Sequence, residues 1–347
     1  MYTASITGAV YSFINNSIMN INWTDVKTFF INQSEVTKIQ LNGTTLWQKS
    51  SGPTPPTPTP DYTEPFYLED LSGSANEIWI YRSSSNSPTI TIETSTDKTT
   101  WSTLGTTANT LGIPLSANGK VYIRCTTNRW TTGYSGYLRF GTYIGNYKVG
   151  GNIMSLLYGS NFTGQETSFP TSDIYTFYYL FYNNSYLKSA GDLLLPATTL
   201  NERCYSSMFS NCTSLISIPE LPAVTLSNYC YERMFQSCAS LTQAPILPST
   251  TLAIGCYTQM FEWCSSLTTA PDLPAATLKD YCYSQMFHGC TNLNYVKCLA
   301  TNRYTSDCTY YWLNNVSSTG TFVKDVNATW STGNYGVPSG WTVQDAS

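Results

Sequence analysis

Few residues of this chain combine the types and spacing that acid–base or nucleophilic catalysis requires. The 347 residues include one histidine, His288, and Ser-His-Asp or Cys-His arrangements depend on an available imidazole. His288 stands where Ser210, Gln236 and Glu262 occur at steps of 26 residues, so we predict an exposed outer residue without a catalytic role. The sequence also lacks a Gly-rich phosphate loop, a Gly-x-Ser-x-Gly elbow and an Asp-x-Asp-x-Asp calcium loop.

Three carboxylates could supply a glycosidase pair, because two carboxylates are the minimum that glycoside hydrolysis needs. Asp192, Glu220 and Asp272 occupy similar places just before Leu-Pro. Because they recur at the period of an internal repeat, we interpret them as polar residues on the turn side. A glycan-processing enzyme is therefore the least favoured of three hypotheses. We predict a protein that is not an enzyme, with no catalytic residue and no cofactor.

The eleven cysteines allow a disulfide framework, a zinc site or a ladder of free thiols. Eight of them form two series at steps of 26 residues, with Cys-x7-Cys inside each unit and no Cys-x-x-Cys anywhere. In a helix such a pair would lie about 12 Å apart, and we expect equivalent cysteines of neighbouring helices to lie beyond the Cα limit for bridging. We therefore favour reduced, buried thiols and predict no metal site. The two series are Cys204, Cys230, Cys256 and Cys282, and Cys212, Cys238, Cys264 and Cys290.

An internal repeat must position these residues. Each unit reads Cys-Tyr-x-x-Met-Phe-x-x-Cys-x-Ser/Asn-Leu and ends in Leu-Pro-Ala/Ser-x-Thr-Leu, with a divergent first copy over 180–200. Cys230, Met234 and Cys238 follow at i, i+4 and i+8, which predicts a short helix with one inward stripe. The tyrosine of each Cys-Tyr pair is interpreted as packing. A fixed period of this length predicts a solenoid, in which stacked units bury what one unit cannot.

The rest of the chain divides by composition. We predict a β-rich docking or oligomerisation domain over 1–50, a Pro/Thr-rich linker over 51–64, and an Ig-like antiparallel β-sandwich over 65–150. Repeats over 151–298 and a C-terminal cap over 299–347 complete the chain. Strands are expected over 77–81, 89–94 and 120–126. The predicted fold class is α+β multidomain: a small N-terminal β domain, an antiparallel β-sandwich, then a leucine-rich-repeat solenoid with a C-terminal cap.

Composition excludes several classes of partner. Only 11% of residues are charged and the formal net charge is −4, which gives no surface that follows phosphates, so we expect no nucleic acid. No apolar run approaches the roughly 20 residues of a membrane span, so we expect no membrane insertion. The first residues lack the basic segment and the following long apolar segment of a signal peptide, so we expect none.

The repeat units resemble BspA-type leucine-rich repeats, because Met-Phe-x-x-Cys-x-x-Leu occurs at 208–215, 234–241, 260–267 and 286–293. The Leu-Pro-Ala-x-Thr-Leu variant resembles repeats of gut Bacteroidales surface proteins and of the phages that infect them, including crAss-like phages. Residues 66–75, 150–159 and 336–343 resemble segments that flank such repeats, so the resemblance covers roughly 62–347. It implies a leucine-rich-repeat architecture and no single function.

The leading hypothesis is a structural phage virion protein, either a head fibre or decoration subunit or a tail fibre subunit. Residues 1–50 would dock on capsid or other virion proteins, and the repeats would bind a host-surface glycan or protein. The expected location is the virion surface, after synthesis in the host bacterial cytoplasm, and the expected state is a homo-oligomer, dimer or trimer. The alternative is a bacterial cell-surface BspA-like adhesin. Ligand-facing candidates are positions that vary while the scaffold repeats: Ser217, Gln243, Thr269, Tyr295, Trp263 and Gln236.

Overall fold

The computed structural model describes residues 60–125, 130–303 and 305–346, together with the backbone of the strands between residues 2 and 48. The chain forms two compact units, Met1–Pro60 and Asp61–Ser347. The side chains of residues 1–50 and most of the predicted linker, on which the docking prediction depends, lie outside the described residues.

The first unit is built from short antiparallel strands. Four of them form a sheet in the order β2-β1-β3-β4, and β5 pairs with β6. Leu41 lies opposite Thr44 in that antiparallel pair, as expected for a β-rich segment. The strands are β1 (Tyr2–Ile6), β2 (Ala9–Phe13), β3 (Phe29–Ile31), β4 (Ser34–Val36), β5 (Lys38–Leu41) and β6 (Thr44–Gln48).

The second unit begins with two sheets, and we call their strands up to β15 the two-sheet region (residues 65–152), since β16 of the larger sheet comes from the repeats. One has the strand order β10-β9-β12-β7-β15-β16 and the other β11-β8-β14-β13. Alternate residues of these strands point inward, so Ile78, Ile80 and Ile92 are fully buried in a common core. The strands are β7 (Tyr67–Asp70), β8 (Asn76–Arg82), β9 (Thr91–Ser95), β10 (Ser102–Thr106), β11 (Leu111–Leu115), β12 (Lys120–Cys125), β13 (Thr131–Gly133), β14 (Gly136–Gly141), β15 (Tyr147–Asn152) and β16 (Leu187–Leu194). The strands expected over 77–81, 89–94 and 120–126 coincide with β8, β9 and β12.

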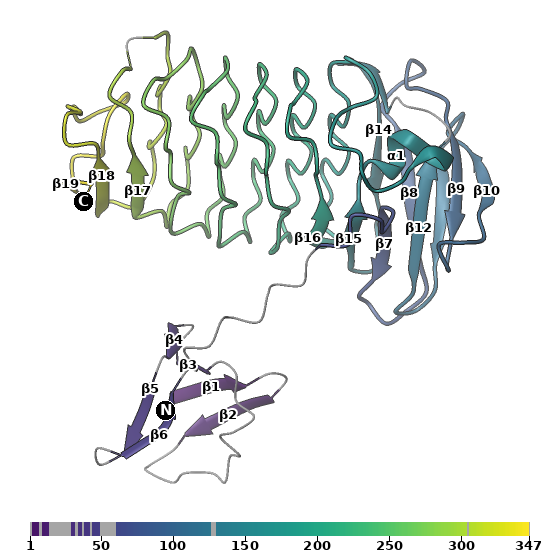
Figure 1. Cartoon of the computed structure of the whole chain (residues 1–347), viewed down its shortest axis with the longest axis horizontal. Helices are drawn as coiled ribbons and strands as arrows, with labels where there is room; N and C mark the ends of the chain where they lie inside the picture. The colour runs from purple at the N-terminus through teal and green to yellow at the C-terminus, as the bar shows by residue number, and fades with distance from the viewer. Residues whose placement is uncertain are drawn as a thin grey trace. The chain divides into compact units, whose positions relative to one another are not determined.

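The larger sheet continues directly into the repeats. β15 pairs in parallel with β16, which lies beyond α1 (Ser155–Tyr158) and the 3-10 turn η2 (Gly159–Asn161). β15 and β16 stand side by side where the sheets meet the turns (Figure 1). One hydrophobic core therefore runs from Phe66 to Trp341 without a break.

The prediction of an α+β fold with a leucine-rich-repeat solenoid is wrong. Within the described residues the only α-helix is the single turn α1, and the segments predicted as helices form tandem turns instead. The cause is visible in the backbone: every fourth residue has a positive φ, for example 52° at Arg203, 55° at Ser207 and 61° at Asn211. A right-handed helix cannot contain left-handed residues at this spacing.

The backbone N–H groups of the tandem turns form hydrogen bonds in two alternating ways. The N–H of Ser206 donates to the carbonyl of Arg203 in the same turn (3.2 Å), whereas the N–H of Tyr205 donates to the carbonyl of Cys230 in the next unit (3.0 Å). Successive units therefore lie side by side like strands of a parallel sheet, although most of their residues are turns (Figure 1). We call the part of the chain between residues 175 and 315, in which these turns recur, the turn stack.

The inward residues of the turn stack form aromatic columns. The Phe column contains Phe209, Phe235 and Phe261, with ring centroids 5.6 and 5.7 Å apart and nearly parallel planes. The tyrosines of the Cys-Tyr pairs form a second column, and all four are at most 2% exposed, which confirms that they are packing residues. Cys230, Met234 and Cys238 are fully buried, which confirms the predicted inward stripe, although the helix predicted to carry it is wrong.

The cysteines are free and buried, but the distance argument for this was wrong. All eleven are free thiols. Because neighbouring units are joined by backbone hydrogen bonds, equivalent cysteines lie at about the 5 Å spacing of paired strands, which is inside the Cα range of disulfides. In the second series the thiol is instead engaged as a donor: Cys238 Sγ lies 3.2 Å from the carbonyl oxygen of Phe209, and Cys264 Sγ lies 3.0 Å from that of Phe235.

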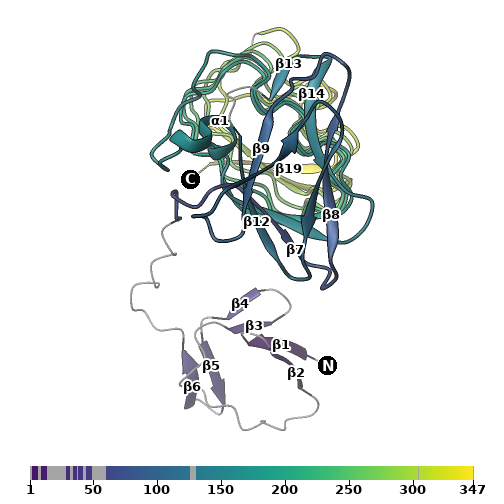
Figure 2. The same ribbon diagram turned by 90° about the vertical axis from the view of Figure 1, so that its right-hand side faces the viewer.

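The C-terminal part ends in the parallel sheet β17-β18-β19. Trp312 is fully buried against Tyr283 of the last Cys-Tyr pair, with ring centroids 6.4 Å apart, and stacks on Trp330 at 5.1 Å. The strands are β17 (Tyr295–Cys298), β18 (Gly320–Lys324) and β19 (Trp341–Asp345). Figure 2 looks at the second unit from the side of the two-sheet region, with β19 behind it. In the part of the chain that the structure describes, no helix has the length and apolar character to cross a membrane.

Candidate functional site

Four of the predicted ligand-facing residues lie in one row. Thr269 pairs in parallel with Tyr295, and Ser217 pairs in the same way with Ser189 of β16. Gln243 holds the equivalent place in the unit between Ser217 and Thr269. Gln243 and Thr269 are exposed, whereas Ser217 and Tyr295 are half-buried. The row continues through strands β18 and β19, which adds hydroxyl side chains at Thr321 and Thr342.

The other two predicted residues lie on the tandem turns. Gln236 is engaged within the scaffold: its amide donates to the carboxylate of Glu262 (2.5 Å) and accepts from the Ser210 hydroxyl (3.2 Å). Gln259 donates to the same buried carboxylate at 2.7 Å. Gln236 therefore satisfies a neighbouring charge and is a poor candidate for a ligand contact.

Trp263 is exposed but covers its neighbour. It is 47% exposed and has a φ of 62°. Its indole ring lies over the next unit, where a Cβ at Gly289 would come within 2.3 Å of Trp263 Cε3. The ring also contacts His288 edge-to-face at 5.0 Å. Trp263 thus offers one aromatic face to solvent from a fixed position.

His288 is less exposed than predicted. It is half-buried between the rings of Trp263 and Tyr311, and its Nδ1 is buried without a hydrogen-bond partner among the described residues. The prediction of an outer residue overlooked the bulk of Trp263 in the preceding unit. Among the described residues, no hydrogen-bond partner of Nδ1 orients this imidazole as a general base would require.

The remaining candidates for chemistry are neutralised or inaccessible. Asp272 pairs with Lys297 (2.7 Å) and Asp192 pairs with Lys148 (3.2 Å), so these carboxylates face lysines rather than one another. Burial raises the pKa of the Cys230 thiol to about 12, which removes the thiolate that nucleophilic attack requires. Within the described residues no group of three or more His, Cys, Asp or Glu side chains is placed to hold a metal ion.

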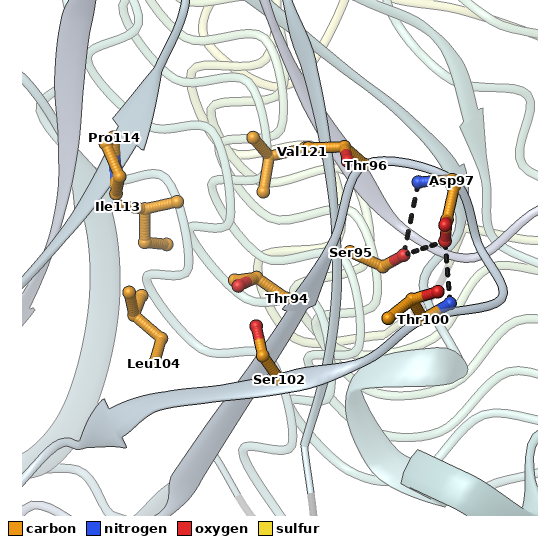
Figure 3. Close-up of a pocket in the computed structure, with 10 residues that line it drawn as sticks. All are labelled: Thr94, Ser95, Thr96, Asp97, Thr100, Ser102, Leu104, Ile113, Pro114 and Val121. Carbon is orange, nitrogen blue, oxygen red and sulfur yellow. Dashed lines mark hydrogen bonds between the residues drawn. The ribbon is translucent and has the colours of Figure 1, made fainter.

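A pocket of about 380 Å³ opens at one edge of the two-sheet region. Figure 3 shows hydroxyl side chains on one side and an apolar side formed by Leu104, Ile113 and Val121. The Asp97 carboxylate is tied into its own loop by the backbone N–H groups of Thr100 (2.7 Å) and Thr99 (2.8 Å). These hydrogen bonds hold the pKa of Asp97 well below its usual range. The Asp97 carboxylate in the pocket lining is therefore ionised and held by its own loop.

Sequence reasoning missed a cluster of tyrosines where the two-sheet region meets the first unit of the turn stack. Their ring centroids form a connected set, including Tyr178–Tyr179 at 4.0 Å, Tyr179–Tyr182 at 4.4 Å and Tyr137–Tyr179 at 4.9 Å. Tyr134 stands at the outer edge and is 66% exposed. We call this set the tyrosine face, and its members are Tyr134, Tyr137, Tyr175, Tyr178, Tyr179 and Tyr182. A signal was present in the sequence, because the next unit carries Ser206, Ser207 and Ser210 where this unit has Tyr178, Tyr179 and Tyr182.

Comparisons with known proteins do not extend this description. Family models, curated proteins and solved structures gave no match to the chain. The assignment of a function therefore rests on the residues and geometry above and on the sequence resemblance.

Proposed function

We propose that this chain is a non-enzymatic binding protein that serves as a structural subunit of a phage virion, a head fibre or decoration protein or a tail fibre. One observation carries the binding part of the proposal: the scaffold separates fixed inward positions from variable outward ones. Columns such as Phe209, Phe235 and Phe261 repeat without change inside. The outward row at Gln243, Thr269 and neighbouring positions differs from unit to unit.

The chemistry of the outward positions supports adhesion over catalysis. The row is rich in Ser, Thr, Gln and Tyr side chains, which donate and accept hydrogen bonds without a charge. Among the candidates for acid, base or nucleophile, Asp272 is paired, Cys230 is buried and His288 has no described group to orient it. Such a surface suits recognition of a host glycan or protein.

The virion part of the proposal is supported by the sequence resemblance to repeat proteins of gut Bacteroidales phages. The docking role of residues 1–50, the location on the virion surface and a dimeric or trimeric state remain predictions. The alternative, a bacterial surface adhesin, would use the same outward positions and differ only in what carries the protein.

Immunogold electron microscopy separates these two assignments. Antibodies against residues 62–347 would be applied to purified phage particles and to candidate host cells that have not been infected. Gold on heads or tails is the expected result, and it would also distinguish a head fibre from a tail fibre. Bare particles together with labelled envelopes of uninfected cells would overturn the virion assignment in favour of the adhesin.

A further inference from the structure

The tyrosine face is not required by the scaffold that carries it. Backbone hydrogen bonds place Tyr179 beside the position of Ser207, since the N–H of Tyr179 donates to the carbonyl of Ser206 (3.3 Å) and that of Phe181 to Met208 (2.8 Å). The next unit keeps the same turns with serine at the places of Tyr178, Tyr179 and Tyr182, although Tyr229 and Tyr281 recur at the place of Tyr175. The turn geometry therefore does not by itself require aromatic residues at these places.

Sealing the junction with the two-sheet region explains only part of the cluster. Tyr178 is 4% exposed and packs against Tyr137 of β14 with ring centroids 5.6 Å apart, which is a structural contact. Tyr134 contacts the same ring at 5.6 Å from the turn between β13 and β14 but remains 66% exposed. A residue that only closed the junction would not leave most of its ring in solvent.

Two of these tyrosines have the positive φ of the tandem turns, 63° at Tyr175 and 59° at Tyr179. Tyrosine also occupies these places in later units, as Tyr229, Tyr281 and Tyr311. The backbone conformation therefore does not distinguish the tyrosine face, whereas the gathering of six rings does.

The cations that touch the tyrosine face are already engaged. The Arg203 guanidinium lies 5.7 Å from the Tyr175 ring centroid and forms an ion pair with Glu232. Arg139 donates to the backbone carbonyl of Tyr182 (3.1 Å) and lies over another ring, that of Tyr81, at 4.8 Å. Among the described residues that contact it, the face therefore presents rings and phenol groups and no cation free to pair with an acidic ligand.

We propose that the tyrosine face is a binding site for a neutral polysaccharide. The apolar faces of hexose rings pack against aromatic rings, and phenol hydroxyls can donate to and accept from sugar hydroxyls. Burial and hydrogen bonding between the rings raise the pKa of Tyr178, so the phenol stays neutral across the physiological range. This inference deepens the proposed function and rests on it, because it names the site and the chemical class of the host-surface ligand.

Affinity electrophoresis of the full chain tests the proposal, with dextran, mannan or galactan embedded in the gel and hyaluronate as the acidic comparison. We expect at least one neutral polysaccharide to retard the chain. The variants Tyr134→Ala and Tyr179→Ser should each weaken that retardation about tenfold in Kd. Tyr281→Ala is the matched control, because it occupies the equivalent turn position to Tyr175 in a later unit and is 39% exposed.

Each outcome has one meaning. Retardation that survives in the double variant Tyr134→Ala/Tyr179→Ser, retardation by hyaluronate alone, or no retardation by the three neutral polysaccharides would overturn the proposed site. Unchanged thermal unfolding of the variants shows that a loss is not caused by misfolding. Attachment of the double variant to host cells at the wild-type level would overturn the site while leaving the proposed adhesion function in place, so the two failures are distinguishable.

Discussion

The two-sheet region and the turn stack bury similar side chains but bond their backbones differently. In the two-sheet region, β8 takes its hydrogen-bond partners from β11 and β14, which are distant in sequence. In the turn stack, alternate N–H groups stay within their own turn and the others reach the next unit. The shape of one unit is thus partly local, whereas its stability depends on its neighbours.

This difference decides where each region can vary. A strand in the two-sheet region exposes every second residue, as in β8, where Ile78 and Ile80 are buried and Trp79 is half-buried. A tandem turn alternates two inward residues with two outward ones, and one of the outward pair has a positive φ. Both regions thus direct half of these residues outward, but the turn stack presents them as adjacent pairs, and the tyrosine face is the place where such pairs are filled with aromatic rings.

Raising the pH should give the largest difference between the two regions, because it should destabilise the turn stack more than the two-sheet region. All cysteines except Cys125 belong to the turn stack or its C-terminal continuation, and burial raises the pKa of Cys212 and Cys230 to about 12 from an ordinary value near 9. Unfolding frees these thiols to ionise, so above about pH 9 the unfolded chain binds fewer protons and becomes relatively more stable. Each such thiol should lower the unfolding free energy by about 1.4 kcal/mol per pH unit between pH 9 and 12.

Urea unfolding at pH 8 and at pH 10, followed by circular dichroism, measures this effect. The control is Cys230→Ala, which should show a shallower dependence on pH by one thiol. Native protein at pH 8 should also react slowly with a thiol reagent. Equal unfolding free energies at the two pH values would show that the thiols are not buried in the folded chain.

Loss of one ring from the Phe column should give the next largest effect. Phe235 is fully buried between Phe209 and Phe261, so Phe235→Ala should lower the unfolding free energy by about 3–5 kcal/mol. Because neighbouring units support one another, amide exchange should also accelerate in the units on both sides. Ile92→Val, a buried change in β9 with an expected cost of about 0.5–1.5 kcal/mol, is the comparison and should affect exchange only in the two-sheet region.

Hydrogen exchange by mass spectrometry distinguishes the two patterns. An increase confined to the unit of Phe235 would mean that each unit is stabilised independently, and the backbone hydrogen bonds between units would then contribute little to stability.

Much of the buried side of the repeat could be predicted from the sequence. The step of 26 residues and the placement of Cys, Tyr, Met and Phe identified which residues face inward, and Cys230, Met234 and Phe235 are all buried. The conformation could not be derived in the same way. Inward residues at i, i+4 and i+8 fit both a helix of 3.6 residues per turn and tandem turns with a period of four. Tyr231 and Phe235 also repeat at four residues, and this second series favours the tandem turns over the predicted helix.

The outward side was harder to predict because no packing constraint acts on it. The row at Ser217, Gln243, Thr269 and Tyr295 followed from the strand-like piece after each unit, and the structure does bring these residues together. The tyrosine face involves the divergent first unit and the turn between β13 and β14, which are joined only by tertiary contacts. A pattern within one repeat cannot show such a juxtaposition.

The smallest predicted effect tests the positive φ directly. Ser237 has a φ of 59°, and its N–H donates to the Glu262 carbonyl (2.7 Å). Ser237→Gly keeps that hydrogen bond and removes the cost of a side chain in the left-handed region, so it should raise the unfolding free energy by up to about 1 kcal/mol. Ser214→Gly is the matched change at a residue outside the positive-φ set. There the added freedom of the unfolded chain should lower the unfolding free energy by about 0.5–1 kcal/mol. A lower urea midpoint for Ser237→Gly would contradict the tandem-turn backbone, since a helix would be destabilised by glycine at that position.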